Sequence, residues 1–165
     1  MSKIARLISA GLIFWIGVIP AAHSAYLAKG RFATHGERRG PQRIINLALR
    51  GDAHAQAVLG FMYANGRDVP QSWDVAVDWY LKSAQAGDPT GQYLLGLMYV
   101  KGLGVAQNVV FAHKWLNLAA AHASLHNREN ILRLRDAVAS KMTQAQLDLA
   151  QQLAVNFIPT AAAPP

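Results

Sequence analysis

The sequence contains no cysteine, and this absence excludes several kinds of structure and chemistry. It rules out a disulfide framework, a thiolate zinc site and a cysteine nucleophile. Charged residues are also scarce, at 15% of the chain, whereas apolar residues make up 52%. That balance excludes intrinsic disorder as the main state, because the chain carries enough apolar surface to offset the conformational entropy lost on folding. Its 165 residues suffice for one domain or one short repeat array.

Acidic residues are nearly absent from the first 50 residues, which hold eight lysines and arginines but a single acid, Glu37. This stretch therefore accounts for the whole net charge of +7. The remaining residues hold eight basic and eight acidic side chains, so the body of the protein is neutral. Any attraction to an anionic surface is expected of the N-terminal part alone.

The N-terminal segment has the pattern of a secretory signal peptide. Two basic residues precede a 13-residue apolar run over 7–19, and Ala22 and Ser24 place small residues before a cleavage point. The run is shorter than the roughly 20 residues needed to span a bilayer. We therefore predict a signal peptide over 1–24 and a periplasmic or secreted mature chain, a location that suits a chain without cysteine. The alternative is an uncleaved N-terminal membrane anchor.

A basic, glycine-containing segment over 25–40 follows the signal segment. It has no regular apolar spacing, which predicts a flexible arm. The arm is expected to be a solvated linker or, alternatively, to make weak contact with a membrane surface through its positive charge. A nucleic acid partner is not expected, because the chain is predicted to be exported.

The body contains an internal repeat of 36 residues. When 51–86 is aligned with 87–122, 13 of the 36 pairs are identical, against about two or three expected from average composition. The positions that mark the repeat are Leu59, Gly60, Tyr63, Gly66 and Trp79 in the first unit, and Leu95, Gly96, Tyr99, Gly102, Gly104 and Trp115 in the second.

Each unit predicts two helices. Asp52 and Asp88 are N-cap candidates for the first helix, since a short acceptor side chain satisfies first-turn amides. Gly66 and Gly102 follow the last apolar residue of that helix, as glycine does at helix C-termini. The second helix is predicted over about 72–85 and its equivalent in the second unit.

A glycine also lies inside the first helix of each unit, at Gly60 and Gly96. There it costs roughly 1 kcal/mol relative to alanine. Its recurrence predicts a close contact with a neighbouring helix, and the large rings of Trp79 and Trp115 are candidates to fill the space nearby.

Further helices are predicted on both sides of the repeats, because terminal units of an array cap its core. The expected layout is a capping helix over 41–51, repeats over 52–87 and 88–123, a degenerate C-terminal helical pair over 124–158 and a disordered tail over 159–165.

These motifs resemble the Sel-1-like repeat family, a relative of the tetratricopeptide repeat. The family pattern Ala-x-x-x-Leu-Gly-x-x-Tyr-x-x-Gly-x-Gly-Val, followed by Ala-x-x-Trp and Ala-x-x-Gly, matches most positions of both units. In the first unit Asp68 replaces the second glycine of Gly-x-Gly. In the second unit Gly91 and Ala123 replace a family alanine and glycine. The resemblance implies an all-α fold, a short right-handed α-solenoid of antiparallel helix pairs. It also implies binding to other proteins, often in the bacterial envelope, and does not imply an enzyme.

By likeness to tetratricopeptide repeats, the first helix of each unit lines a concave face. The predicted partner-binding residues on that face are His54, Phe61, Asn65, Tyr93, Leu97 and Lys101. Three of them are large apolar residues outside the packing pattern, and such anchors carry much of the energy of an interface. The alternative is that the terminal helices cover this face.

Catalytic and metal-binding signals are weak. His122 and His126 have the spacing of two metal ligands on one helix, and His113 could join them. However, the pair lies on both sides of the predicted turn after the second unit. We therefore predict no metal, no cofactor and no catalytic residue. The expected function is an exported protein–protein interaction module, a scaffold or regulator in the bacterial envelope. The alternative is an envelope enzyme or enzyme regulator with a site near the three histidines.

Overall fold

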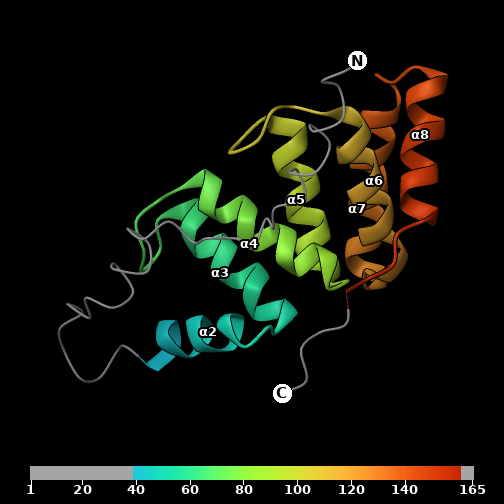
Figure 1. The fold of residues 1–165 in the computed structure, drawn as a ribbon. Coiled ribbons are helices and arrows are strands. Elements are labelled where there is room, and N and C mark those ends of the chain that lie inside the picture. The colour runs from blue at the N-terminus through green and yellow to red at the C-terminus, as the bar shows by residue number, and fades with distance from the viewer. Residues whose placement is uncertain (1–38, 161–165) are drawn as a thin grey trace, which may run out of the picture. The chain divides into compact units, whose positions relative to one another are not determined.

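The computed structural model describes residues 39–160 (Figure 1). Within this range the chain forms seven helices and no strand. The helices are α2 (Arg39–Leu49), α3 (Ala53–Asn65), α4 (Trp73–Gln85), α5 (Pro89–Lys101), α6 (Val109–His122), α7 (Leu125–Ala139) and α8 (Gln144–Val155). None of the helices in 39–160 is both long and apolar enough to cross a membrane. The predicted signal peptide, most of the predicted arm and the last five residues lie outside the described residues.

The helices stack in the order in which they occur in the chain. α3 packs against α4 and α5 against α6, and these two repeat pairs join where α4 packs against α5. α2 packs on α3 at the start of the array, so that the pairs follow one another in Figure 1. This arrangement confirms the predicted α-solenoid of antiparallel helix pairs.

The predicted helix ends are also confirmed. The Asp52 carboxylate accepts a hydrogen bond from the backbone N–H of Ala55 at 2.7 Å, and the Asp88 carboxylate accepts one from Gly91 at 2.8 Å. α3 and α5 end at Gly66 and Gly102, whose φ values of 66° and 68° lie in the left-handed region. Only glycine adopts this region without steric cost, which explains why both units have it at this position.

Identical glutamines form identical bonds in the two units. Gln56 donates from Nε2 to the carbonyl of Ala48 at 3.2 Å, and Gln92 donates to the carbonyl of Ala84 at 3.3 Å. Both glutamines are buried. Each bond joins the first helix of a unit to the helix before it. The junction before the first unit therefore has the same hydrogen bond as the junction between the two units.

The glycines inside the first helices are contact positions, as predicted, but their neighbours are not the tryptophans. A Cβ added at Gly60 would lie 2.6 Å from ring carbons of Tyr80, and one added at Gly96 would lie 3.0 Å from Cγ of Leu116. The neighbouring side chain comes from the residue after each tryptophan. In the 3.6-residue periodicity of a helix, one residue turns the side chain by about 100°, and this turn places the next residue over the glycine.

The two tryptophans pack elsewhere and are still buried. Trp79 is 7% exposed and Trp115 is 4% exposed. The Nζ of Lys82 lies 4.2 Å from the ring centre of Trp79, and that of Lys114 lies 4.3 Å from the ring of Trp115. Each ring therefore fills the core with one side and carries a lysine over its face, a favourable electrostatic contact.

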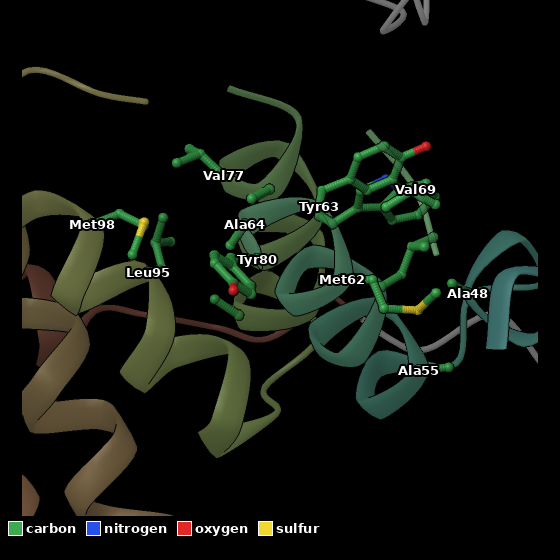
Figure 2. Packing of buried hydrophobic residues seen from close by; sticks show 14 of the residues in the cluster. Ala48, Ala55, Met62, Tyr63, Ala64, Val69, Val77, Tyr80, Leu95 and Met98 are labelled. Carbon is green, nitrogen blue, oxygen red and sulfur yellow. The ribbon is translucent and has the colours of Figure 1, made fainter. Parts of the chain in front are cut away.

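Most buried apolar residues of α2 to α5, together with Trp115 of α6, form one hydrophobic cluster. In the view of Figure 2 it runs from Ala48 of α2, through Met62 and Tyr80, to Leu95 and Met98 of α5. A second cluster lies between α6 and α7 and contains Leu116 and Ile131 among its buried residues. Neither repeat could bury its apolar residues alone, which is the usual reason that such units occur in arrays.

The C-terminal part differs from the predicted helical pair and tail. α7 and α8 both pack against α6, and α8 makes no extensive contact with α7. After α8 the chain returns to the repeats: the ring centres of Phe157 and Trp115 are 5.4 Å apart, and the backbone N–H of Thr160 donates to the carbonyl of Gln85 at 2.8 Å. Pro159 and Thr160, expected in a disordered tail, are therefore held against the connection between α4 and α5.

Replacing Gly60 by alanine should destabilise the fold. The added methyl group would overlap the buried Tyr80 ring, and such overpacking costs about 1–3 kcal/mol. The gain in helix propensity is only about 1 kcal/mol. Gly40→Ala in α2 is the control, because a Cβ there meets no atom within 4 Å. Urea denaturation should show a lower free energy of unfolding for Gly60→Ala only; equal effects of the two substitutions would contradict the close-contact explanation.

Candidate functional site

The first helices of the two repeats, together with the start of α7, enclose a hollow of about 620 Å³. Its apolar lining includes Ala57 and Phe61 of α3, Tyr93 and Leu94 of α5, and Ile131 of α7. Phe61 is 46% exposed, although its ring is large and apolar. The hollow therefore presents accessible apolar surface on the face formed by the first helices.

The other wall of the hollow is polar, and Oδ1 of its Asn130 accepts a hydrogen bond from the Arg133 guanidinium at 2.7 Å. None of the described residues that line the hollow carries a charge. Thr90 belongs to α5, whereas Ser124 and Asn127 belong to α7 and the turn before it. The Ser124 hydroxyl makes no capping bond to α7, and the side chains of Thr90 and Asn127 form no hydrogen bond with another described residue. These three groups are thus available to a bound molecule.

The hollow exists because the turn between units changes after the second repeat. Gly51 and Gly87, which precede the N-caps of α3 and α5, have φ values of 92° and 91°. Ala123 is the equivalent residue before α7, and its φ of −69° and ψ of 150° are those of extended backbone. A Cβ disfavours the positive φ of the glycines, so the chain leaves α6 in another direction.

This change of direction alters which helices meet. α3 packs against α5, but α7 packs against α6 without comparable packing on α5. The space between α5 and α7 is left open, and residues of both helices line it. Ala123, which replaces a glycine of the family pattern, is thus the position at which the hollow forms.

Two of the six predicted partner-binding residues line the hollow, namely Phe61 and Tyr93. The other four lie outside its lining. Leu97 is half-buried and packs against the core of the first repeat, and Lys101 is exposed in the last turn of α5. Whether these residues bind a partner stays a prediction.

The two remaining residues are engaged within the chain. Nδ1 of His54 lies 3.6 Å from Oδ2 of Asp88, and Nδ2 of Asn65 donates to the carbonyl of Phe61 at 2.8 Å. The residues that the sequence prediction missed are those of α7, above all Asn127. The replacement of Gly-Asp by Ala-Ser at 123–124 was the signal that a new surface begins there.

The three histidines of the alternative site have different surroundings. His113 is buried in α6, and its Nδ1 has no hydrogen-bond partner. His122 is exposed at the end of α6, with Nδ1 3.2 Å from the carbonyl of Leu118, and His126 is exposed in the first turn of α7. Among residues 39–160, no three histidine or acidic side chains gather where they could hold a metal ion together.

The profile of the Sel1 repeat matches this chain twice in succession, over 53–88 and 89–124. A solved Sel1 repeat protein from Oxalobacter formigenes is 34% identical, with a TM-score of 0.54, and the similarity covers 67% of this chain and 82% of that one. The chain belongs to the Sel1 repeat family.

A second solved structure extends the similarity. It is c5321, a protective antigen of uropathogenic Escherichia coli with the same repeat fold, which is 26% identical with a TM-score of 0.68. The similarity covers 86% of this chain, but the chain spans only 30% of the length of c5321. Among the curated proteins, none matches the chain.

Family membership agrees with the geometry of the array. The second matched Sel1 repeat ends at Ser124, the position at which the turn changes and the hollow begins. Sel1 repeats generally serve as protein–protein interaction modules, and this fold is typically a non-catalytic scaffold. The function of this Sel1 repeat protein is therefore expected to depend on its exposed surface.

His113 should make the stability of the protein depend on pH. Burial, with a smaller contribution from the charge of Arg135, lowers the pKa of His113, and Asp136 opposes this shift. A histidine in the unfolded chain has a pKa of about 6.5 and so binds protons more tightly. Stability should be complete above about pH 6.5 and fall below it, toward the pKa of the folded state.

His113→Leu removes this titration, so melting temperatures measured from pH 7.5 to 5 should fall less in the variant than in the wild type. His122→Gln, at an exposed position of the same helix, is the control for replacing a histidine. If His122→Gln flattens the profile and His113→Leu does not, the assignment to His113 is wrong.

Proposed function

We propose that this protein is an exported scaffold or regulator of the bacterial envelope that binds a protein partner on the face formed by α3 and α5. The observation that carries the proposal is Phe61, an aromatic side chain that is 46% exposed beside an open hollow. Aromatic residues next to a pocket are the usual energetic centres of protein interfaces.

Two further observations support this face over others. Tyr93 of the next repeat lines the same hollow as Phe61, so aromatic residues of successive units face one space. Parts of the second helices, in contrast, are covered by the returning C-terminal segment, which packs on Trp115. No described residue of that segment lines the hollow on the first helices.

The envelope location rests on the signal-peptide pattern over 1–24 and on the lack of cysteine. It agrees with the description of c5321 as a protective antigen, since an antigen must be accessible to antibodies. The basic arm before α2 is proposed to be a linker, with weak membrane contact as its alternative role.

Partner contact at α3 should be detectable by crosslinking. Benzoylphenylalanine introduced at position 61 and irradiated in living cells should crosslink a defined protein. The matched control is position 111, because Phe111 is also exposed, at 38%, but lies on α6 with its ring 5.3 Å from that of Tyr99. Crosslinks of equal strength and identity at both positions would contradict the proposed face.

Charge reversal of the same surface gives a second readout. Phe61→Asp should lower co-purification of the crosslinked partner by about tenfold, because a carboxylate would be desolvated without a counter-charge. Phe111→Asp should lower it much less. Circular dichroism must show native helicity in both variants, and an unfolded Phe61→Asp protein would assign Phe61 to the core instead.

Export with cleavage predicts the mass of the mature protein. Intact-mass spectrometry of the envelope fraction should find a chain that begins at Ala25 or Tyr26. A chain of full length in the membrane fraction would instead support the N-terminal anchor, and one in the cytoplasm would refute export.

A further inference from the structure

We propose that mild acid releases α7 from α6, because protonation of the buried His113 breaks the contact between these helices, and that this release removes one wall of the hollow beside Phe61. Such a conformational change goes beyond the proposed function and needs no partner. Three features of the structure support it: the position of His113, the charges around it and the few contacts that hold α7.

His113 lies in the contact between α6 and α7. It is 4% exposed, and its Nδ1 has no hydrogen-bond partner. Asn117 is four residues further along α6, so both side chains lie on one face of the helix. Nη1 of Arg135 in α7 donates to Oδ1 of Asn117 at 3.2 Å, which places this face of α6 against α7. A protonated imidazole has an N–H on each nitrogen, and the one at Nδ1 would be buried without an acceptor.

The charges of α7 do not compensate a protonated His113. Burial, the largest cause, and the positive charge of Arg135 both lower the pKa of His113, while Asp136 opposes them with a smaller effect. The carboxylate of Asp136 already accepts a hydrogen bond from Nη2 of Arg135 at 2.7 Å, and Asp136 is exposed. It is therefore engaged with the arginine and not with the buried imidazole.

The other two helices that pack extensively on α6 provide no buried carboxylate either. α5 has no acidic residue; burial raises the pKa of its Tyr99, which therefore stays neutral, and its Lys101 is exposed. α8 has one acidic residue, Asp148, which is exposed and accepts a hydrogen bond from Nε2 of Gln144 at 2.7 Å. Protonation would thus leave a buried charge without a counter-charge, and movement of α7 away from α6 would give that charge access to water.

Few contacts hold α7 in place. Only two of its residues are buried, Ile131 and Val138, and its N-cap Ser124 forms no side-chain capping bond. Ile131 and Val138 belong to the hydrophobic cluster between α6 and α7, which is separate from the cluster of the repeats. Segments with few buried apolar contacts open at a lower free energy than the whole protein. α7 can therefore leave α6 while the repeats remain folded.

Release of α7 would change the hollow but not the rest of the face. Ile131 lines the hollow from α7, whereas Phe61 and Tyr93 line it from α3 and α5. α8 has its own attachment, because it packs on α6 and is followed by Phe157, whose ring lies against Trp115. The aromatic residues of the first helices would thus stay in place and lose the apolar cover that Ile131 provides.

Amide hydrogen exchange of the mature protein, followed by mass spectrometry, measures this opening. Rates are divided by the intrinsic exchange rate at each pH, so that the opening constant remains. In the open state His113 binds its proton with a pKa of about 6.5, and in the closed state it binds it less tightly. The opening constant of residues 131–138 should therefore rise by up to about tenfold between pH 7.5 and 5.5. Residues of α3 should remain more strongly protected than these at both pH values.

Replacing His113 tests the cause of the opening. His113→Leu should abolish the rise, and His113→Gln gives the same readout if the leucine variant does not fold. The matched control is His126→Gln, because His126 is an exposed histidine of α7 itself. This variant should show the same rise as the wild type.

Four results would overturn the proposal. Equal protection of α7 and α3 would mean that the protein opens only as a whole, and an unchanged opening constant at pH 5.5 would mean that acid does not release α7. Stronger protection of α7 at pH 5.5 would mean that Asp136 pairs with the protonated ring. A rise that persists without His113 would assign it to another group. Because the measurement involves no partner, failure of crosslinking at position 61 would refute the proposed function alone.

Discussion

The close approach of the two helices within each repeat is the contact on which the rest of the array depends. Because Gly60 and Gly96 lack a Cβ, the ring of Tyr80 and the side chain of Leu116 lie directly against the backbone of the first helix. Packing at this distance sets the position of the second helix and hence the point from which the next unit starts. The buried Gln92 then joins that unit to the one before it, so one spacing is carried along the array.

The same logic explains how a regular array produces an irregular surface. Two successive units share a left-handed glycine before the first helix, and the third position has Ala123 in extended backbone. The change affects one residue, yet it directs a whole helix away from its expected neighbour. A surface that would have been a contact between α5 and α7 becomes an open hollow with an aromatic and a carboxamide wall.

The C-terminal segment links this altered end to the regular repeats. Phe157 packs edge-on against Trp115, with the Nζ of Lys114 over both rings, and burial lowers the pKa of this lysine. Pro159 lies close to Gly87, at the connection between α4 and α5. The segment therefore holds α8 and the junction between repeats together, and none of its described residues lines the hollow.

Local features of this protein were predictable because they depend on residues close in the chain. The capping by Asp52 and Asp88 follows from spacing within one helical turn. The need for a small residue at Gly60 was predicted because a glycine recurs there after the 36-residue period. The exposure of Phe61 beside a pocket was also predicted from its place outside the packing pattern.

Contacts between distant segments could not be predicted from the sequence. They depend on the angles between helices, and a repeat period gives no information about these angles. Tyr80 rather than Trp79 covers Gly60, because a single residue turns a helical side chain by about 100° and the helix rotation was unknown. Leu97 packs against the core, and this could not be predicted because the rotation of α5 about its axis was also unknown. Asn127 and Ile131 line the hollow because the extended backbone at Ala123 directs α7 across the end of the hollow. The direction of α7 after this turn is set by the packing of α7 on α6, which the sequence does not show.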